Sequence, residues 1–116
     1  MTRAMKILTL QFSALAGGTL MIATVAGMAK AAPPAAAVQI ANFTFKAQVV
    51  TVKPGTTVTW TNADDIPHTV TSTSGAFKSK VLDSGDKFSF TFAKAGQFGY
   101  YCALHPHMTG TVIVKA

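Results

Sequence analysis

The chain has 116 residues, a formal charge of +6 at neutral pH and a single cysteine. This length is enough for one small domain with a modest core. The lysines do not form a basic cluster, so the composition gives no support to nucleic-acid binding and indicates only mild steering toward an acidic partner. A chain with one cysteine cannot form an internal disulfide.

The N-terminal segment has the layout of an export signal. Arg3 and Lys6 precede a long stretch of mostly apolar or small residues, and residues 29–31 (Ala-Lys-Ala) resemble a cleavage site. We therefore expect residues 1–31 to be a signal peptide that is cleaved near Ala31. An uncleaved anchor is the alternative, because the apolar stretch is long enough to span a bilayer. Only in that case do we expect the protein to associate with a membrane.

The remainder of the chain shows the pattern of short strands. Residues 32–37 contain two prolines and are expected to form a flexible linker. Beyond them apolar and polar residues alternate with a period of two, which is typical of half-buried strands. Residues 77–82 are ambiguous between irregular chain and a short edge strand. The expected strands cover 38–45 with a break near Asn42, 49–52, 56–62, 68–71, 87–92, 97–102 and 109–115.

The same alternation indicates which side chains face inward. No segment after residue 31 shows a helical period longer than a turn or two. The fold expected for residues 38–116 is therefore all-β, either an antiparallel β-sandwich or a closed barrel of short strands. The residues expected on inward faces are Val58 and Trp60, then Phe88, Phe90 and Phe92, and finally Phe98, Tyr100 and Cys102.

The last part of the chain concentrates side chains that bind metals. Cys102, His105 and Met108 follow one another at intervals of three residues, and Met108 is the only methionine outside the export signal. Pro106 stiffens the segment that joins the last two. With His68 from a distant turn, these residues provide a thiolate, two imidazoles and a thioether. This is the ligand set of a trigonal copper site with a weak axial methionine.

Each of these residues taken alone has an ordinary structural explanation, such as a buried free cysteine or a core methionine. Their clustering favours copper. Zinc held by Cys102, His68, His105 and His107 is the main alternative. Pro106 makes joint chelation by the two histidines that flank it awkward. Catalytic Cys–His chemistry would need a substrate cleft and an orienting residue, for which so short a chain leaves little room, so we do not expect an enzyme.

At these residues the sequence resembles the cupredoxins, the small blue copper proteins, and most closely their amicyanin and plastocyanin-like group. The resemblance implies a Greek-key β-sandwich with one type 1 copper per chain. It also implies a periplasmic carrier of single electrons, a monomer that docks transiently with a larger redox protein such as a dehydrogenase, a cytochrome, or a copper oxidase or reductase. The matching segments are 42–45, 53–62, 65–70 and 101–110, and the implied copper ligands are His68, Cys102, His105 and Met108.

Further expectations concern the neighbours of the site and the alternative functions. His107 stands where amicyanins carry an apolar residue, and we expect it to be an exposed histidine beside the site. Thr69 is expected to give the cysteine sulfur a hydrogen bond, through its backbone N–H or its side chain. The alternative function is copper binding or copper delivery without electron transfer. A binding module without metal would leave the sulfur clustering unexplained.

Overall fold

The structure is a computed structural model that describes residues 34–116, and the expected signal segment lies outside these residues. The described part of the chain contains no helix, and therefore none that is long and apolar enough to cross a membrane. Its strands are β2 Ala35–Ala41, β3 Thr44–Lys46, β4 Val49–Val52, β5 Thr56–Asn62, β6 Thr71–Ser72, β7 Lys87–Phe92, β8 Gly96–Cys102 and β9 His105–Val114.

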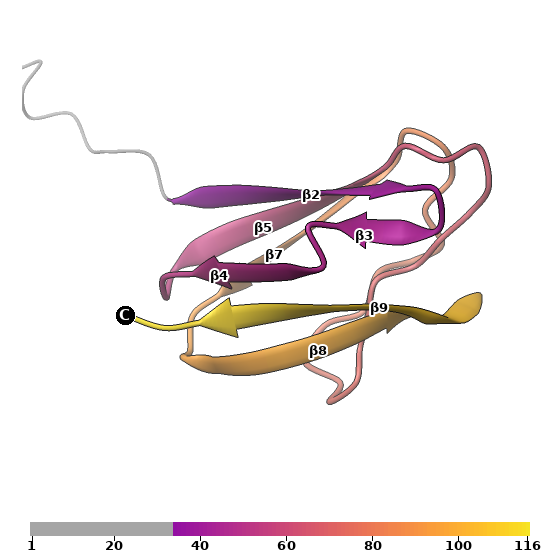
Figure 1. The fold of residues 1–116 in the computed structure, drawn as a ribbon. Coiled ribbons are helices and arrows are strands. Elements are labelled where there is room, and N and C mark those ends of the chain that lie inside the picture. The colour runs from indigo at the N-terminus through magenta and orange to yellow at the C-terminus, as the bar shows by residue number, and fades with distance from the viewer. Residues whose placement is uncertain (1–33) are drawn as a thin grey trace, which may run out of the picture. The chain divides into compact units, whose positions relative to one another are not determined.

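The strands form two four-stranded sheets that face each other, in the orders β3-β2-β5-β7 and β4-β9-β8-β6 (Figure 1). The expected all-β sandwich is therefore confirmed. The sheets are mixed rather than purely antiparallel, because β2 runs parallel to β5 and β4 runs parallel to β9. Alternation of apolar residues reports which face of a strand is buried, but not the direction of the neighbouring strand, so it does not predict these parallel pairs.

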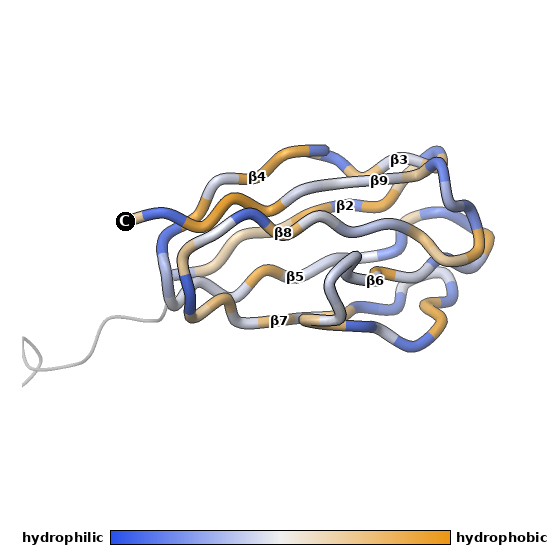
Figure 2. Tube along the Cα trace, turned by 90° about the horizontal axis from the view of Figure 1, so that it is seen from below, coloured by the Kyte–Doolittle hydropathy of each residue, from blue (hydrophilic) through white to orange (hydrophobic). Residues whose placement is uncertain are grey.

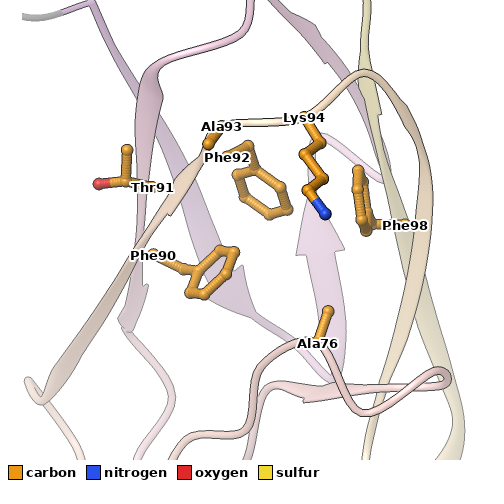
Figure 3. Close-up of a pocket in the computed structure, with 7 residues that line it drawn as sticks. All are labelled: Ala76, Phe90, Thr91, Phe92, Ala93, Lys94 and Phe98. Carbon is orange, nitrogen blue, oxygen red and sulfur yellow. The ribbon is translucent and has the colours of Figure 1, made fainter.

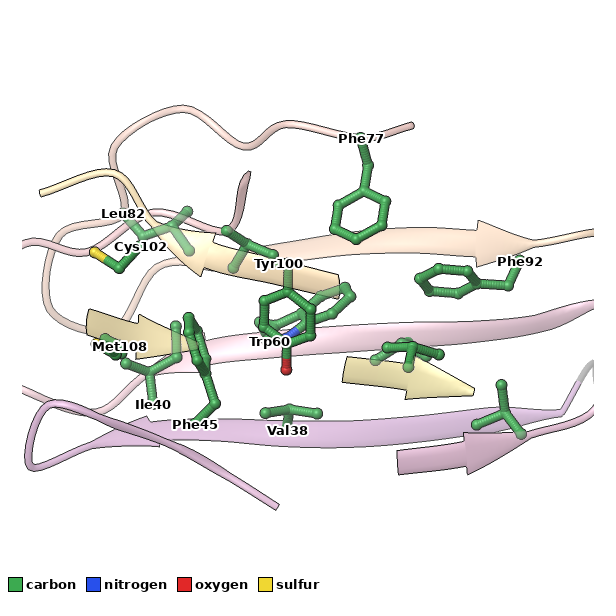
Figure 4. Close-up of a cluster of buried hydrophobic side chains, with 14 of the residues drawn as sticks. Val38, Ile40, Phe45, Trp60, Phe77, Leu82, Phe92, Tyr100, Cys102 and Met108 are labelled. Carbon is green, nitrogen blue, oxygen red and sulfur yellow. The ribbon is translucent and has the colours of Figure 1, made fainter. Parts of the chain in front are cut away.

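The core lies between the two sheets and is built around Trp60 and Tyr100 (Figure 4). The two rings meet edge to face, with their centroids 5.3 Å apart. Hydrophobic residues recur along the strands between hydrophilic ones, as the sequence pattern predicted (Figure 2). The expected inward faces of β5, β7 and β8 all contact this core. Phe88 and Phe90 are only half-buried, because β7 lies at the edge of its sheet.

Tyr100 fits between the sheets because its partner residue across β8 and β9 is Gly110. A Cβ atom at Gly110 would lie 2.4 Å from the Tyr100 hydroxyl oxygen and from the ring carbon that bears it. The side-chain hydroxyl of Tyr100 and the indole N–H of Trp60 are both buried without a hydrogen-bond partner. The centre of the sandwich is thus held by packing rather than by polar contacts.

Two strand boundaries differ from the expected ones. β2 begins at Ala35, inside the range expected to be a linker, because the chain pairs there with Thr57 and its neighbours in β5. β9 begins at His105 rather than near residue 109. The reason is that β8 and β9 are joined by a tight turn at Ala103 and Leu104, so the expected ligand loop is mostly strand.

The expected strand 68–71 is reduced to β6 and one isolated bridge. His68 pairs with Leu82 through two backbone hydrogen bonds, from His68 N to Leu82 O at 3.0 Å and from Leu82 N to His68 O at 2.7 Å. A second isolated bridge joins Thr71 to Lys78. The ambiguous segment 77–82 is therefore irregular chain with local pairing. It fixes the backbone of His68 at the end of the sandwich where β8 turns into β9.

Candidate metal centre

Cys102 and His105 meet because they are paired across the β8–β9 hairpin. Residues that face each other in an antiparallel pair carry their side chains on the same face. The register places Cys102 opposite His105, with an irregularity between Tyr101 and Cys102. The Cys102 Sγ atom lies 3.6 Å from His105 Nδ1. Cys102 is fully buried, whereas His105 is only partly buried.

His68 reaches the same sulfur from the other part of the chain. Its Nδ1 atom lies 3.7 Å from Cys102 Sγ, and its side chain is fully buried. One ring nitrogen each of His68 and His105 and the sulfur of Cys102 all lie within 4.8 Å of one another. A cysteine sulfur beside two imidazole nitrogens is the equatorial donor set of a trigonal copper site, so these residues fit that metal.

Met108 lies at the same end of the core as Cys102 (Figure 4). It begins the inward-facing row of β9 that continues through Gly110, Val112 and Val114, and it is 6% exposed. Cys102 ends the corresponding inward row of β8. The two sulfur side chains are therefore the terminal members of two adjacent core rows, which explains how residues of the hydrophobic core come to face a metal site.

Thr69 ties the His68 segment to the hairpin in two ways. Its backbone N–H donates to Cys102 Sγ at 3.3 Å, and its Oγ1 accepts from the backbone N–H of Ala103 at 2.7 Å. The expected hydrogen bond from Thr69 to the sulfur is thus confirmed, and the backbone N–H is the donor. A donor aimed at a metal-binding sulfur withdraws electron density from it and fixes its position.

Asp64 fixes the opposite side of the His68 ring. Its Oδ2 lies 2.7 Å from His68 Nε2. Burial raises the pKa of Asp64, but backbone hydrogen bonds from Phe43 and Asn42 and the contact with His68 outweigh it, so this pKa lies below its ordinary value of 3.8. An ionised carboxylate at Nε2 favours the tautomer with the proton there, which leaves the Nδ1 lone pair free for a metal.

Asn62 organises the turn that carries Asp64. Its buried side chain donates to the backbone oxygens of Ile66 and Leu82, each at 2.9 Å, and accepts from the backbone N–H of Asp64 at 2.9 Å. The last residue of β5 therefore holds both the acidic turn and the segment that pairs with His68. A buried amide with its hydrogen bonds satisfied fixes such a turn in one arrangement.

The turn between β2 and β3 completes the surroundings of the site. Phe43 makes edge contacts with the rings of His68 and His105, at centroid distances of 5.6 Å and 5.1 Å. Neither Phe43 nor Asp64 was predicted from the sequence to have a role at the site. An acidic residue four positions before His68 was a visible signal for Asp64. No local signal connects Phe43 with the histidines, because the contact depends on the folded chain.

The surface around the site is largely apolar. Phe43 and Leu104 are exposed large hydrophobic side chains, with 53% and 47% of their surface accessible. His105 is partly buried and less exposed than either of them, while His107 is exposed as expected. His107 is not among the residues whose ligand atoms gather at the site within residues 34–116. This finding does not support the zinc arrangement that includes His107.

A hollow lies at the end of the sandwich opposite the metal centre (Figure 3). It has a volume of about 230 Å³ and is lined mainly by the rings of Phe90, Phe92 and Phe98, with Lys94 beside them. These residues flank the turn before β8, whereas Cys102 ends that strand. The hollow contains no metal-ligating side chain, so it is separate from the metal centre.

Comparisons with known proteins agree with this geometry. A family model described as a cupredoxin-like domain matches residues 12–114. Amicyanin-alpha from Methylorubrum extorquens is 36% identical over 112 residues, covering 89% of this chain and 94% of the relative. Amicyanin from Paracoccus denitrificans is 36% identical over 75% of this chain and 70% of the relative. The solved structure of the Cu(I) form of an amicyanin variant superimposes with a TM-score of 0.68 at 34% identity, covering 74% of this chain and 87% of that one.

Proposed function

Because this chain belongs to the cupredoxin-like family, we propose that it carries single electrons between larger redox proteins, with one type 1 copper as its cofactor. The observation that carries the proposal is the position of the Cys102 sulfur, 3.7 Å and 3.6 Å from nitrogens of His68 and His105. Copper, when bound, supplies the one-electron change between Cu(I) and Cu(II). A carrier of this kind has no substrate and is not an enzyme.

The proposed ligands are three strong donors and one weak one. The Cys102 thiolate, the Nδ1 atoms of His68 and His105, and the Met108 thioether would hold the copper, with the thioether as the weak donor. Thr69 tunes the site through its N–H bond to the sulfur. Three of the four ligands come from one hairpin, and the fourth is fixed by the bridge to the segment 77–82.

The hydrogen bonds around these ligands make the site rigid before copper arrives. Asp64 holds the His68 ring, and Thr69 holds both the sulfur and the turn after it. A ligand set that keeps one geometry in both oxidation states lowers the reorganisation that accompanies each electron transfer. This rigidity supports electron transfer over delivery of the metal, since delivery requires the ligands to open.

The exit for the electron is the partly exposed edge of His105. The exposed side chains of Leu104 and Phe43 flank it and give the protein an apolar contact surface. Such a surface suits brief docking with a larger redox protein, for which small interfaces are typical. The positive formal charge favours partners with acidic surfaces.

We propose a monomer located in the periplasm, in agreement with the export-signal layout of residues 1–31.

The test is the visible spectrum of the protein after addition of one equivalent of Cu(II), with Cys102→Ser as the matched control. We expect an intense blue band from thiolate-to-copper charge transfer, bleached by a mild reductant, restored on reoxidation and absent in the variant. Weakly absorbing copper in the wild-type protein would contradict the proposal. Rapid transfer of the copper to an acceptor protein or chelator, without redox cycling, would favour copper delivery instead.

A further inference from the structure

We propose that Phe43 is a cap on the copper site, a positioning residue that covers both histidine ligands and is held there by Asp64. The inference rests on the proposed function, because it concerns access to the copper that His68 and His105 bind. The cap excludes small ligands from outside and slows exchange of the metal. Three independent observations support this role.

The first observation is the contact of one ring with two ligands. The Phe43 ring meets the rings of His68 and His105 at interplanar angles of 90° and 89°, which is a favourable edge-to-face arrangement on both sides. The two histidine rings themselves lie 5.0 Å apart. Phe43 therefore spans the pair, with its remaining surface, 53% of the residue, open to solvent. His105 cannot swing outward without displacing this ring.

The second observation is the backbone of the turn. Asn42 and Phe43 have φ angles of 59° and 57°, and they join β2 to β3 as a two-residue turn. Such turns need positive φ at both positions and favour glycine at the second, because a bulky residue is strained there. Position 43 carries a phenyl ring where glycine would form the turn more easily. The turn alone does not account for that ring.

The third observation is the carboxylate that holds the turn. Asp64 Oδ1 accepts from the Asn42 N–H at 2.6 Å, and Oδ2 accepts from the Phe43 N–H at 3.0 Å. The same Oδ2 lies 2.7 Å from His68 Nε2. Asp64 itself is fixed by the bond from its N–H to Asn62. One carboxylate thus joins the turn to a copper ligand and sets the position of the ring relative to the histidines.

A small pocket lies beside Phe43. It has a volume of about 140 Å³ and is lined by Phe43, His107 and Met108, with Gln48 and other residues of β3 and β9. The Phe43 ring forms part of the wall of this pocket and also contacts the histidines. Removal of the ring would connect the pocket with the histidine side of the site, and a small anion would then reach the copper.

The main test compares three substitutions in the copper-loaded protein. Phe43→Gly removes the ring and suits the positive φ, and Phe43→Leu keeps apolar bulk. Val49→Ala is the matched control, because Val49 is an equally exposed apolar residue on β4, at 54%. The half-life of the blue band in excess chelator is measured, together with its response to azide.

We expect Phe43→Gly to shorten this half-life by about tenfold or more, as for other changes to groups that orient metal ligands. It should also acquire an azide-dependent spectral change that the wild type lacks. Phe43→Leu should restore most of the wild-type half-life, and Val49→Ala should match the wild type. A Phe43→Gly protein with the wild-type half-life and no azide response would overturn the proposal, as would an equal loss in Phe43→Leu.

A readout in the copper-free protein tests the geometry directly. The ring current of Phe43 should displace the NMR resonances of the His68 and His105 ring protons, and both Phe43 substitutions should abolish the displacement. Unchanged resonances would contradict the contact. Urea unfolding of copper-free Phe43→Gly should give a midpoint no lower than that of the wild type, because glycine relieves the strained turn. A lower midpoint would overturn the claim that the ring serves the site rather than the turn.

Asp64→Asn tests the holding role, because the amide keeps the shape but replaces one accepting oxygen by a donor. It should shorten the copper half-life, as Phe43→Gly does, and a wild-type half-life would contradict the role of Asp64.

The proposed function and the proposed cap would fail in different ways. Absence of a blue band in the wild type would defeat the proposed function, whereas a normal blue band with an unaffected Phe43→Gly protein would defeat the cap alone.

Discussion

The two ends of the sandwich are built from the same strands but are held together by different forces. At the far end, Phe90, Phe92 and Phe98 surround an apolar hollow, and the contacts among them are aromatic. At the ligand end, a hydrogen bond from Asn62 fixes the backbone of Leu82, which pairs with His68, and one from Thr69 fixes the Cys102 sulfur. Position along a strand therefore decides the role of an inward residue. In β8 the same inward row begins with a packing residue and ends with Cys102, a proposed metal ligand.

The largest change in the free energy of unfolding is expected for a substitution at the far end, which should leave the copper site unaffected. Phe92 is buried, with 1% of its surface exposed, and contacts both Phe90 and Phe98. Phe92→Ala should lower the free energy of unfolding of the copper-free protein by about 3–5 kcal/mol, as measured by urea unfolding. The position and intensity of the blue band in the copper-loaded variant should match the wild type. A shifted band would show that the two ends are coupled.

For Asn62→Ala, at the ligand end, we expect a smaller loss of stability but faster loss of copper. The substitution removes the Asn62 donor from the backbone oxygens of Ile66 and Leu82, of which the Leu82 oxygen keeps its bond from the His68 N–H, and it releases the turn that carries Asp64. Unsatisfied buried groups cost about 1–3 kcal/mol, so the free energy of unfolding should fall less than in Phe92→Ala. The copper half-life in excess chelator should nevertheless shorten, because His68 loses support. A larger loss of stability with an unchanged copper site would contradict the comparison.

The smallest expected change in the free energy of unfolding concerns Tyr100, which lies midway between the two ends. Burial raises the pKa of its hydroxyl above the ordinary 10.0, and Trp60 offsets this only in part, because the two groups make no hydrogen bond of good geometry. Above about pH 10 the unfolded chain loses this proton while the folded chain keeps it, so the free energy of unfolding falls as pH rises.

Tyr100→Phe lacks this group. The free energies of unfolding of the wild type and of Tyr100→Phe should differ little at neutral pH. Above about pH 10 the variant should become increasingly more stable than the wild type. Urea unfolding at several pH values measures it. A difference independent of pH would show that the hydroxyl ionises equally in the folded and unfolded chains.

The sequence predicted what local pattern and residue chemistry determine. The alternation of Val58 with Trp60 and of Tyr100 with Cys102 identified inward faces correctly, because the side-chain period of a strand is visible in any short window. After residue 31 the chain has one cysteine and one methionine, and their closeness in the sequence indicated a copper ligand set that includes Met108.

The missed features all depend on contacts between distant segments. The parallel pairing of β2 with β5 arises from the path of the chain between the sheets, which no window of sequence reports. Asp64 holds the turn at Asn42 and Phe43 across 21 to 22 residues. The sequence places an acidic residue in a turn, but it does not show which backbone groups that residue will face.

The pairing of β4 with β9 has a consequence for the order of folding. The residues Val49 to Val52 lie beside Thr111 to Val114, near the C-terminal end of the chain, so the second sheet is incomplete until that end is available. Contacts between such distant residues form slowly, since a long segment of chain must be closed first. His105 and Met108 belong to the same last strand. Until β9 pairs with β4 and β8, the second sheet is therefore unfinished, and the side chains proposed to bind copper are not yet gathered.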